Sequence, residues 1–445
     1  MNSETQPICL VGQALVDVTL PQYGQPIKMR LGGIFHAARA LWAMGTPFTL
    51  GYIAPSYLTS QVETYATAHG ALHVRRLGTV EGSPNVILIG EVKEVGHQGY
   101  EYLLRDEHHS TMDAEALAQL LRTPQASDIL VISGGFDLAA VATTARNCGV
   151  RLHVDLTGVS DDWSVIRSLQ EPLETLTLST SSGLFREHFQ SKPSSYWEEV
   201  LPALTRAALL KENRGGSRLR VSASSTATST PAFLGETHHS IGVGDCFDAA
   251  WIALRRTRPD PEALAYASLV AADYAATTDP DTFRASASAS IALSSQDVLQ
   301  APGVTLPWES RASVNVYLAA PDFDFTDRQP INAVAEALRY HNFVPRLPVR
   351  ENGQMGLNAT PARKAKLLAA DLALLDECQI VVAVLTYNDP GTLIEIGIAC
   401  ERKMPVIVYD LSCHTENLVL TGLPTLVTDD IERVISCVYQ QAAES

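Results

Sequence analysis

Two carboxylates stand close together where an apolar run passes into a predicted helix. Asp389 and Glu395 follow the apolar residues 380–385, and Gly391 lies between the two acids. Cleavage of a glycosidic bond needs a carboxylate that attacks or stabilises the electron-poor anomeric carbon. Glycine lets backbone and ligand approach each other closely. The pattern therefore predicts a site for glycosidic chemistry, in which Glu395 is the candidate carboxylate.

The same stretch also has a purely structural interpretation. Thr392 and Glu395 match the T-x-x-E capping box, in which the two side chains bind free backbone N–H groups at the start of a helix. Spacing alone favours the capping box over chemistry, so both interpretations stay open on this ground.

A second candidate site precedes another apolar helix, where residues 240–251 read SIGVGDCFDAAW. Exposed N–H groups of Gly242, Val243 and Gly244 at the helix start would form an anion site. Asp245, held beside a bound phosphate, could take a proton from a hydroxyl nucleophile. A tight turn with an acid in the first helical turn is the structural alternative.

Strands and helices alternate around both sites. Apolar runs predict strands at 8–12, 128–132 and 152–155, and a helix at 36–44 that Gly45 ends. A second alternation predicts strands at 314–318, 343–347, 380–385 and 405–409, with helices at 330–340, at 360–377 and from 392. Such alternation is typical of layered α/β folds with mostly parallel sheets. Ligands bind there at the carboxyl ends of the strands.

Residues 282–312 interrupt this alternation, because they are rich in Ala and Ser and then carry Gly and Pro. We interpret them as a linker region between a first domain, 1–304, and a second domain, 313–445.

The amino-acid composition limits which classes of partner the protein is expected to bind. With 33 basic and 49 acidic side chains the net charge is −16, and no basic run occurs, so a nucleic-acid partner is disfavoured. Seven cysteines without a CxxC pair predict neither a disulfide scaffold nor a metal site. The pairs His108-His109 and His238-His239 lack further ligands and are predicted to be surface residues. The chain shows no signal peptide and no apolar run of membrane length, so we expect a cytoplasmic protein without a membrane partner.

The carboxy-terminal part resembles nucleoside 2-deoxyribosyltransferases and related nucleotide N-glycosidases. Its signature D-x-G-T-x-x-E-x-G-x-A is matched from Asp389 to Ala399, and the family's Y-L-A-G-P strand is matched from Tyr317 to Pro321. The resemblance covers about residues 313–445 and implies a small flavodoxin-like domain with a doubly wound parallel sheet.

By this resemblance Glu395 attacks the anomeric carbon and forms a glycosyl-enzyme intermediate, while Tyr317 orients it. Asp371 and Asp389 would position the sugar or handle the proton of the leaving base. Gly391 and Thr392 would belong to the substrate site. Asn417 resembles a segment that reaches into a neighbouring subunit's site, which implies a homodimer or a larger even-numbered oligomer.

The amino-terminal part resembles the PfkB, or ribokinase-like, sugar and nucleoside kinases. Residues 12–17, 31–36 and 240–247 match that family's first strand, its G-G-x-x-x-N segment and its T-G-A-G-D-x-F motif, in family order. The resemblance implies a ribokinase-like α/β domain that uses ATP and Mg²⁺. Asp245 would be the catalytic base and Gly242, Val243 and Gly244 the anion hole. Asp17, Gly33 and His36 would contact the sugar.

At three places the sequence departs from the pattern of the PfkB kinases. His36 stands where the family usually has asparagine, residues 179–182 (STSS) lie where its N-x-x-E metal and phosphate motif is expected, and the nucleotide-side glycine motif is blurred into residues 213–216.

Together the two resemblances predict a bifunctional enzyme that acts on a small nucleoside or nucleotide. Its second domain would cleave or transfer the N-glycosidic bond, and its first would phosphorylate a nucleoside or sugar with ATP. The alternative is a regulated, nucleotide-depleting effector whose first domain only senses a ligand.

Overall fold

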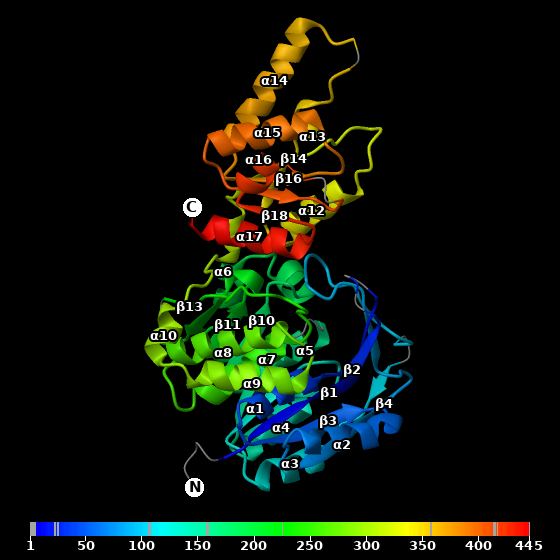
Figure 1. Ribbon diagram of the computed structural model, residues 1–445. Helices are drawn as coiled ribbons and strands as arrows, with labels where there is room; N and C mark the ends of the chain where they lie inside the picture. The colour runs from blue at the N-terminus through cyan, green and yellow to red at the C-terminus, as the bar shows by residue number, and fades with distance from the viewer. Residues whose placement is uncertain are drawn as a thin grey trace. The chain divides into compact units, whose positions relative to one another are not determined.

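A computed structural model shows two compact units (Figure 1). One comprises Met1–Glu94 and Gln98–Thr305, and the other comprises Leu306–Ser445 together with Val95–His97. The structure describes residues 6–21, 24, 26–105, 108–156, 160–224, 226–356, 358–412, 415 and 417–444, with the backbone alone for 160–162.

The first unit is built on a sheet with the strand order β13-β12-β11-β10-β9-β8-β1-β3-β4-β7. The strands from β11 to β4 along this order are parallel, and β12, β13 and β7 are antiparallel additions at the edges. Apolar runs such as 128–132 are buried throughout, as expected for parallel strands covered on both faces. The bounds are β1 (Ile8–Thr19), β3 (Phe48–Ala54), β4 (Val74–Glu81), β7 (His109–Ser110), β8 (Asp128–Ile132), β9 (Arg151–Leu156), β10 (Leu173–Ser179), β11 (Thr205–Lys211), β12 (Ser217–Val221) and β13 (Thr228–Thr230).

Three further strands extend the far end of β1. They are β2 (Lys28–Gly33), β5 (Val86–Ile89) and β6 (Tyr100–Tyr102). β2 and β5 both pair with β1, and β6 pairs with β5.

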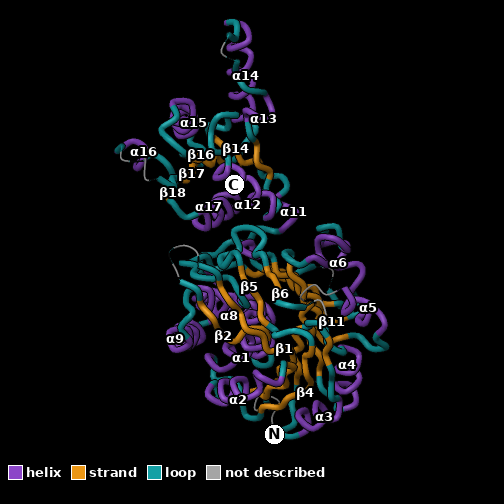
Figure 2. Tube along the Cα trace, turned by 90° about the vertical axis from the view of Figure 1, so that its right-hand side faces the viewer, coloured by secondary structure: helices purple, strands orange, loops and turns teal. Residues whose placement is uncertain are grey.

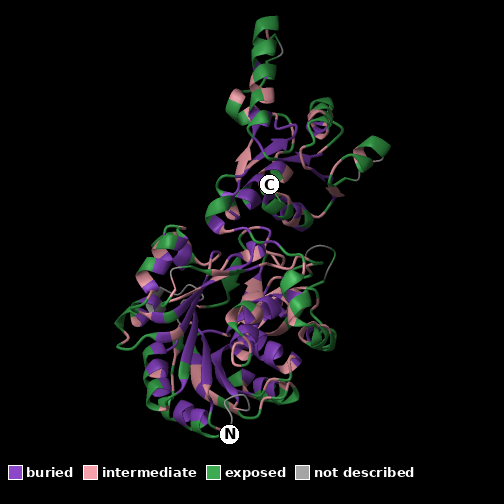
Figure 3. Ribbon diagram, turned by 90° about the vertical axis from the view of Figure 1, so that its left-hand side faces the viewer, coloured by how far each residue is buried: buried purple, intermediate pink, exposed green. Residues whose placement is uncertain are grey.

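Helices lie on both sides of this sheet, with α1, α8 and α9 on one side and α3 to α6 on the other (Figure 2). α7 packs against α1 and α8, and most of its residues are buried, including Trp251. In this unit the buried residues follow the strands and the helix faces that cover them (Figure 3). The bounds are α1 (Ile34–Ala43), α2 (Thr59–Ala68), α3 (Ala114–Arg122), α4 (Leu138–Asn147), α5 (Ser160–Ser168), α6 (Pro193–Val200), α7 (Val243–Leu254), α8 (Asp260–Ala275), α9 (Pro280–Ala292) and α10 (Ser295–Gln300).

Gly45 follows α1 with a φ of 67°, a left-handed conformation that explains why glycine ends this helix. The sequence therefore located the end of α1 correctly.

Most of residues 282–312 is helical, contrary to the linker interpretation. α9 and α10 occupy residues 280–300, and α9 packs against α8 and α1. Phe283 and Ala287 are four residues apart, so they share one face of α9 and are buried there. The small Ala and Ser residues of this stretch resemble a linker in composition, but two well-spaced apolar side chains suffice to dock the helix.

The second unit has a five-stranded, fully parallel sheet in the order β15-β14-β16-β17-β18. Counted along the chain this order is 2-1-3-4-5, the doubly wound order of flavodoxin-like folds. The bounds are α11 (Trp308–Arg311), β14 (Asn315–Ala319), α12 (Gln329–Tyr340), β15 (Val344–Arg346), α13 (Pro348–Asn352), α14 (Pro361–Asp376), β16 (Ile380–Val384), α15 (Pro390–Glu401), β17 (Val406–Tyr409), α16 (Leu418–Gly422), β18 (Leu426–Thr428) and α17 (Ile431–Glu444). The sequence pattern does not predict α11, α13, α16, β18 and α17.

Within the described residues, none of the helices combines the length and the apolar character needed to cross a membrane.

Candidate active sites

The start of α15 tests the capping-box interpretation of the carboxy-terminal motif. Asp389 is the N-cap, and its Oδ2 accepts hydrogen bonds from the backbone N–H of Thr392 at 2.8 Å and from the Thr392 hydroxyl at 3.0 Å. Thr392 is therefore the third residue of the helix rather than its cap. Glu395 lies in the second turn, not in the first as we had expected. The capping-box interpretation is wrong, and Glu395 is left without a role in capping.

Glu395 instead meets Tyr317, a residue of β14. The Tyr317 hydroxyl donates a hydrogen bond to Glu395 Oε1 at 2.6 Å. The Tyr317 side chain is buried in the apolar cluster between the sheet and its helices, which fixes the direction of the hydroxyl. This hydrogen bond holds one oxygen of the carboxylate and leaves Oε2 for a ligand.

The surroundings of Glu395 raise the pKa of its carboxyl group towards neutral pH. Burial raises the pKa of Glu395 to about 7, the Tyr317 hydrogen bond lowers it, and the charges of Asp371 and Asp389 raise it. Burial and the neighbouring Glu395 likewise raise the pKa of Tyr317 well above its usual value, so Tyr317 stays a hydrogen-bond donor. Perturbed carboxyl groups of this kind cluster at functional sites.

Asp371 lies on α14, half-buried, with its charge acting on both Glu395 and Tyr317. The Asn352 side-chain amide donates a hydrogen bond to Asp371 Oδ1 at 2.8 Å. The first half of α14, with Lys364 and Lys366, is exposed, but the solvated helix face does not extend to Asp371. The structure thus brings Tyr317, Asp371 and Asp389 around Glu395. Asn352 carried no motif that could have identified it from sequence.

Gly391 and Asn417 complete the predicted residues of this unit. A Cβ on Gly391 would approach Asp389 Oδ2 to 2.9 Å, so glycine keeps the cap of α15 free of crowding. Asn417 is exposed and caps α16, where its Oδ1 accepts from the backbone N–H of Val419 at 2.8 Å. Within this single chain, none of the described contacts joins Asn417 to Glu395.

In the first unit, the turn from Gly242 to Asp245 begins α7 as expected. Gly242 is the N-cap with a φ of 71°, and a Cβ at this position would overlap the His36 ring. Burial raises the pKa of Asp245 to about 7, Asp155 raises it further, Lys211 lowers it, and Asp17 raises it. A carboxylate with such a pKa suits proton transfer near neutral pH.

The predicted sugar-binding residues also meet, but they bind one another. His36 Nε2 lies 3.0 Å from Asp17 Oδ2, and His36 Nδ1 lies 2.7 Å from the Tyr274 hydroxyl. Asp17 and His36 are each 3% exposed. Burial lowers the pKa of His36 to about 4 despite the opposing charge of Asp17, so the ring is neutral at pH 7.

Two glycines allow this close packing. Gly33 has a φ of 59°, and a Cβ on Gly32 would overlap the Asp17 carboxylate. His239, predicted to lie at the surface, is instead fully buried, with Nε2 3.0 Å from the Thr277 carbonyl. Its ring packs edge-on against Tyr274, which the sequence pattern could not show.

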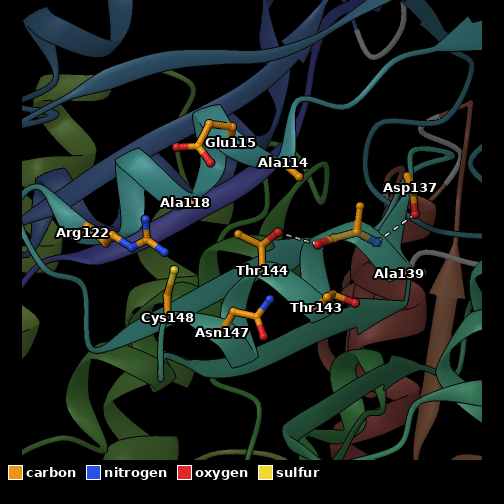
Figure 4. A pocket seen from close by; sticks show the side chains of 11 residues that line it. Ala114, Glu115, Ala118, Arg122, Asp137, Ala139, Thr143, Thr144, Asn147 and Cys148 are labelled. Atoms are coloured by element: carbon orange, nitrogen blue, oxygen red, sulfur yellow. Dashed lines mark hydrogen bonds between the residues drawn. The ribbon is translucent and has the colours of Figure 1, made fainter.

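A groove of about 520 Å³ lies between α3 and α4, away from these residues (Figure 4). Its polar lining includes Glu115, Arg122, Asp137 and Asn147. None of the residues predicted for chemistry lines it, so we assign it no part in either site.

Comparison with known proteins identifies the two units separately. Residues 316–422 match the family model of nucleoside 2-deoxyribosyltransferase. The resemblance stated for the second unit is thus confirmed, and this part of the chain is a nucleoside 2-deoxyribosyltransferase domain.

The first unit has the ribokinase-like fold. A structure described as ribokinase II from E. coli, in complex with ATP and Mg²⁺, is 14% identical, covers 64% of this chain and 99% of its own, and has a TM-score of 0.51. A ribokinase from Arabidopsis thaliana with ribose and ATP is 15% identical (65% and 100% covered, TM-score 0.47). A nucleoside kinase from Burkholderia thailandensis with inosine is 15% identical (63% and 96% covered, TM-score 0.46). A search of curated proteins gave no match. At such low identity the likeness establishes the fold alone.

The Tyr317 hydrogen bond yields the first prediction. Because this bond lowers the pKa of Glu395, Tyr317→Phe should raise that pKa further above about 7. In any activity that needs ionised Glu395, the acid limb of the pH profile should then shift to higher pH. Turnover measured as a function of pH tests this. Tyr409→Phe, which removes a hydroxyl from the end of β17, is the matched control. An unchanged profile in Tyr317→Phe would show that Glu395 does not act as an ionised group.

Proposed function

We propose that this protein cleaves or transfers the N-glycosidic bond of a nucleoside or nucleotide, with Glu395 as the nucleophile. The observation that carries the proposal is the buried Glu395 carboxyl group, hydrogen-bonded to Tyr317 and relieved of any capping role. The family match over residues 316–422 supports the same chemistry.

In the proposed reaction Glu395 Oε2 attacks the anomeric carbon while the carbon–nitrogen bond breaks and the base leaves with the bonding electrons. Water supplies the proton that the leaving base takes up, and Asp371 or Asp389 relays it. The negative charges of these aspartates also favour the positive charge that develops on the sugar ring. Water or a second base then attacks the glycosyl ester and releases Glu395.

For the first unit, a second candidate function is phosphoryl transfer to a nucleoside or sugar from ATP. Asp245 supports it, because a carboxyl group with a pKa of about 7 beside the Gly242–Gly244 turn can accept the proton of an attacking hydroxyl. The burial of Asp17 supports the alternative, a domain that only senses a ligand, because the group expected to bind sugar hydroxyls is only 3% exposed.

Replacement of the nucleophile tests the main proposal. Glu395→Ala should lower the release of base from a nucleoside and nucleotide mixture by at least about a thousandfold. The melting temperature should change little, because Asp389 caps α15. Mass spectrometry identifies the released bases, and Glu401→Ala, an exposed Glu of the same helix, is the control. Near-normal release by a folded Glu395→Ala protein would refute the assignment.

Phosphoryl transfer is tested at Asp245. With a panel of nucleosides and sugars, Asp245→Asn should abolish ATP consumption and leave base release by the second unit in place. Asp281→Asn, at an exposed position of α9, serves as the control. If the unmodified protein phosphorylates no member of the panel, the ligand-sensing alternative is favoured instead.

We also predict a homodimer or larger even-numbered oligomer with a shared site. On α16 the side chains Leu418, Val419 and Leu423 are 84%, 58% and 58% exposed, an apolar surface that a neighbouring subunit would cover. If Asn417 completes a partner's site, mixing Asn417→Ala chains with Glu395→Ala chains should restore activity, because each mixed dimer contains one intact site. Light scattering gives the mass of the assembly. A fully active monomer would contradict the model.

A further inference from the structure

One lysine of the first unit lies between buried carboxylates, beside the Gly242–Gly244 turn. Lys211, the last residue of β11, has its Nζ 2.9 Å from Asp155 Oδ2 and 2.8 Å from Asp248 Oδ2. Asp155 comes from β9 and Asp248 from α7, and both are buried. The ammonium also lies against the anion turn, since a Cβ on Gly244 would approach Nζ to 3.0 Å.

These carboxylates do not offer a free site for a divalent cation. Mg²⁺ binds through one or two carboxylates, several waters and substrate phosphates, in strict octahedral geometry. Here the two buried carboxylates share one ammonium, and a dication at the same oxygens would face a positive charge about 3 Å away. Among the described residues, no group of three or more His, Cys, Asp or Glu side chains is arranged to hold a metal ion.

Neighbouring groups do not supply the missing ligands. Glu212, the next residue after Lys211, forms a two-pronged ion pair with Arg218 at 2.7 and 2.8 Å. Residues 179–182 bring hydroxyls only, and these bind other groups of the protein. The Thr180 hydroxyl donates to the Asn213 side chain at 2.6 Å. Ser179 and Ser181 share a hydrogen bond of 2.7 Å, and Ser182 donates to the Ser179 carbonyl at 2.8 Å.

The Lys211 side chain stays protonated and positively charged at neutral pH. Burial by itself would lower the pKa of Lys211, but Asp155 and Asp248 raise it above its ordinary value. An ammonium has three N–H groups, and the two carboxylates use two of them. One remains, and the ammonium lies beside Gly244 of the anion turn.

We propose that Lys211 is the built-in counter-charge of this site and takes the place of a divalent cation held by the protein. The first unit would then recruit no Mg²⁺ through Asp155 and Asp248, and an anionic group at the turn would meet Lys211 and backbone N–H groups. This holds whether the unit transfers phosphate or senses a ligand, and it does not depend on Glu395.

Titration of the nucleotide-free, full-length protein with Mn²⁺, followed by electron paramagnetic resonance, tests the proposal. The unmodified protein should show no Mn²⁺ binding that depends on Asp155 or Asp248. Lys211→Met should bind Mn²⁺ at least about tenfold more tightly, equivalent to about 1.4 kcal/mol, because the two carboxylates lose their counter-charge. Asp155→Asn added to Lys211→Met should remove this gain. Lys192→Met, at an exposed lysine, should behave as the unmodified protein.

Two results would overturn the proposal. One is Mn²⁺ binding by the unmodified protein that Asp155→Asn or Asp248→Asn abolishes. The other is a folded Lys211→Met protein, checked by circular dichroism, whose Mn²⁺ affinity equals that of the Lys192→Met control. Should Lys211→Met fail to fold, the comparison of the unmodified protein with Asp155→Asn and Asp248→Asn still decides the question.

Discussion

A carboxylate that leaves water must either hold its proton or find a partner, and this requirement governs both units. Glu395 and Asp245 are the acids whose pKa rises to about 7, and each stands beside a helix start where a ligand can approach. Asp155 and Asp248 share the Lys211 ammonium, and burial also raises the pKa of Asp248 well above its usual value. Because perturbed carboxyl groups cluster at functional sites, Glu395 and Asp245 are the candidates for chemistry.

In the second unit the parallel sheet places Tyr317 beside Glu395. Tyr317 and Glu395 are 78 residues apart in the chain, yet β14 and the helix that follows β16 lie side by side and bring them within 2.6 Å. Asp389 ends the preceding loop and caps α15, which fixes the helix start and hence the position of Glu395 one and a half turns later. A buried tyrosine, a capped helix and a neighbouring sheet strand therefore act together on one carboxylate.

The first unit combines a ribokinase-like fold with a buried cluster of charged groups. Its strands and helices keep the ribokinase arrangement, as the comparison with the E. coli structure shows. The groups at the carboxyl ends of the strands nonetheless bind one another through His36 and Lys211. Function resides in such a site and not in the fold that carries it.

The sequence by itself determined the order of most elements and the two α/β units, and it proposed Glu395, Tyr317 and Asp245 as candidates, because these follow from local apolar runs, glycine turns and short motifs. It could not decide whether Thr392 or Asp389 caps α15, since both residues are good caps and only the helix start distinguishes them. It misread α9 as a linker, because composition does not show which Ala or Phe docks. The pairing of Lys211 with Asp155 and Asp248, and of Asn352 with Asp371, joins residues 19 to 56 positions apart, so only tertiary packing could decide it.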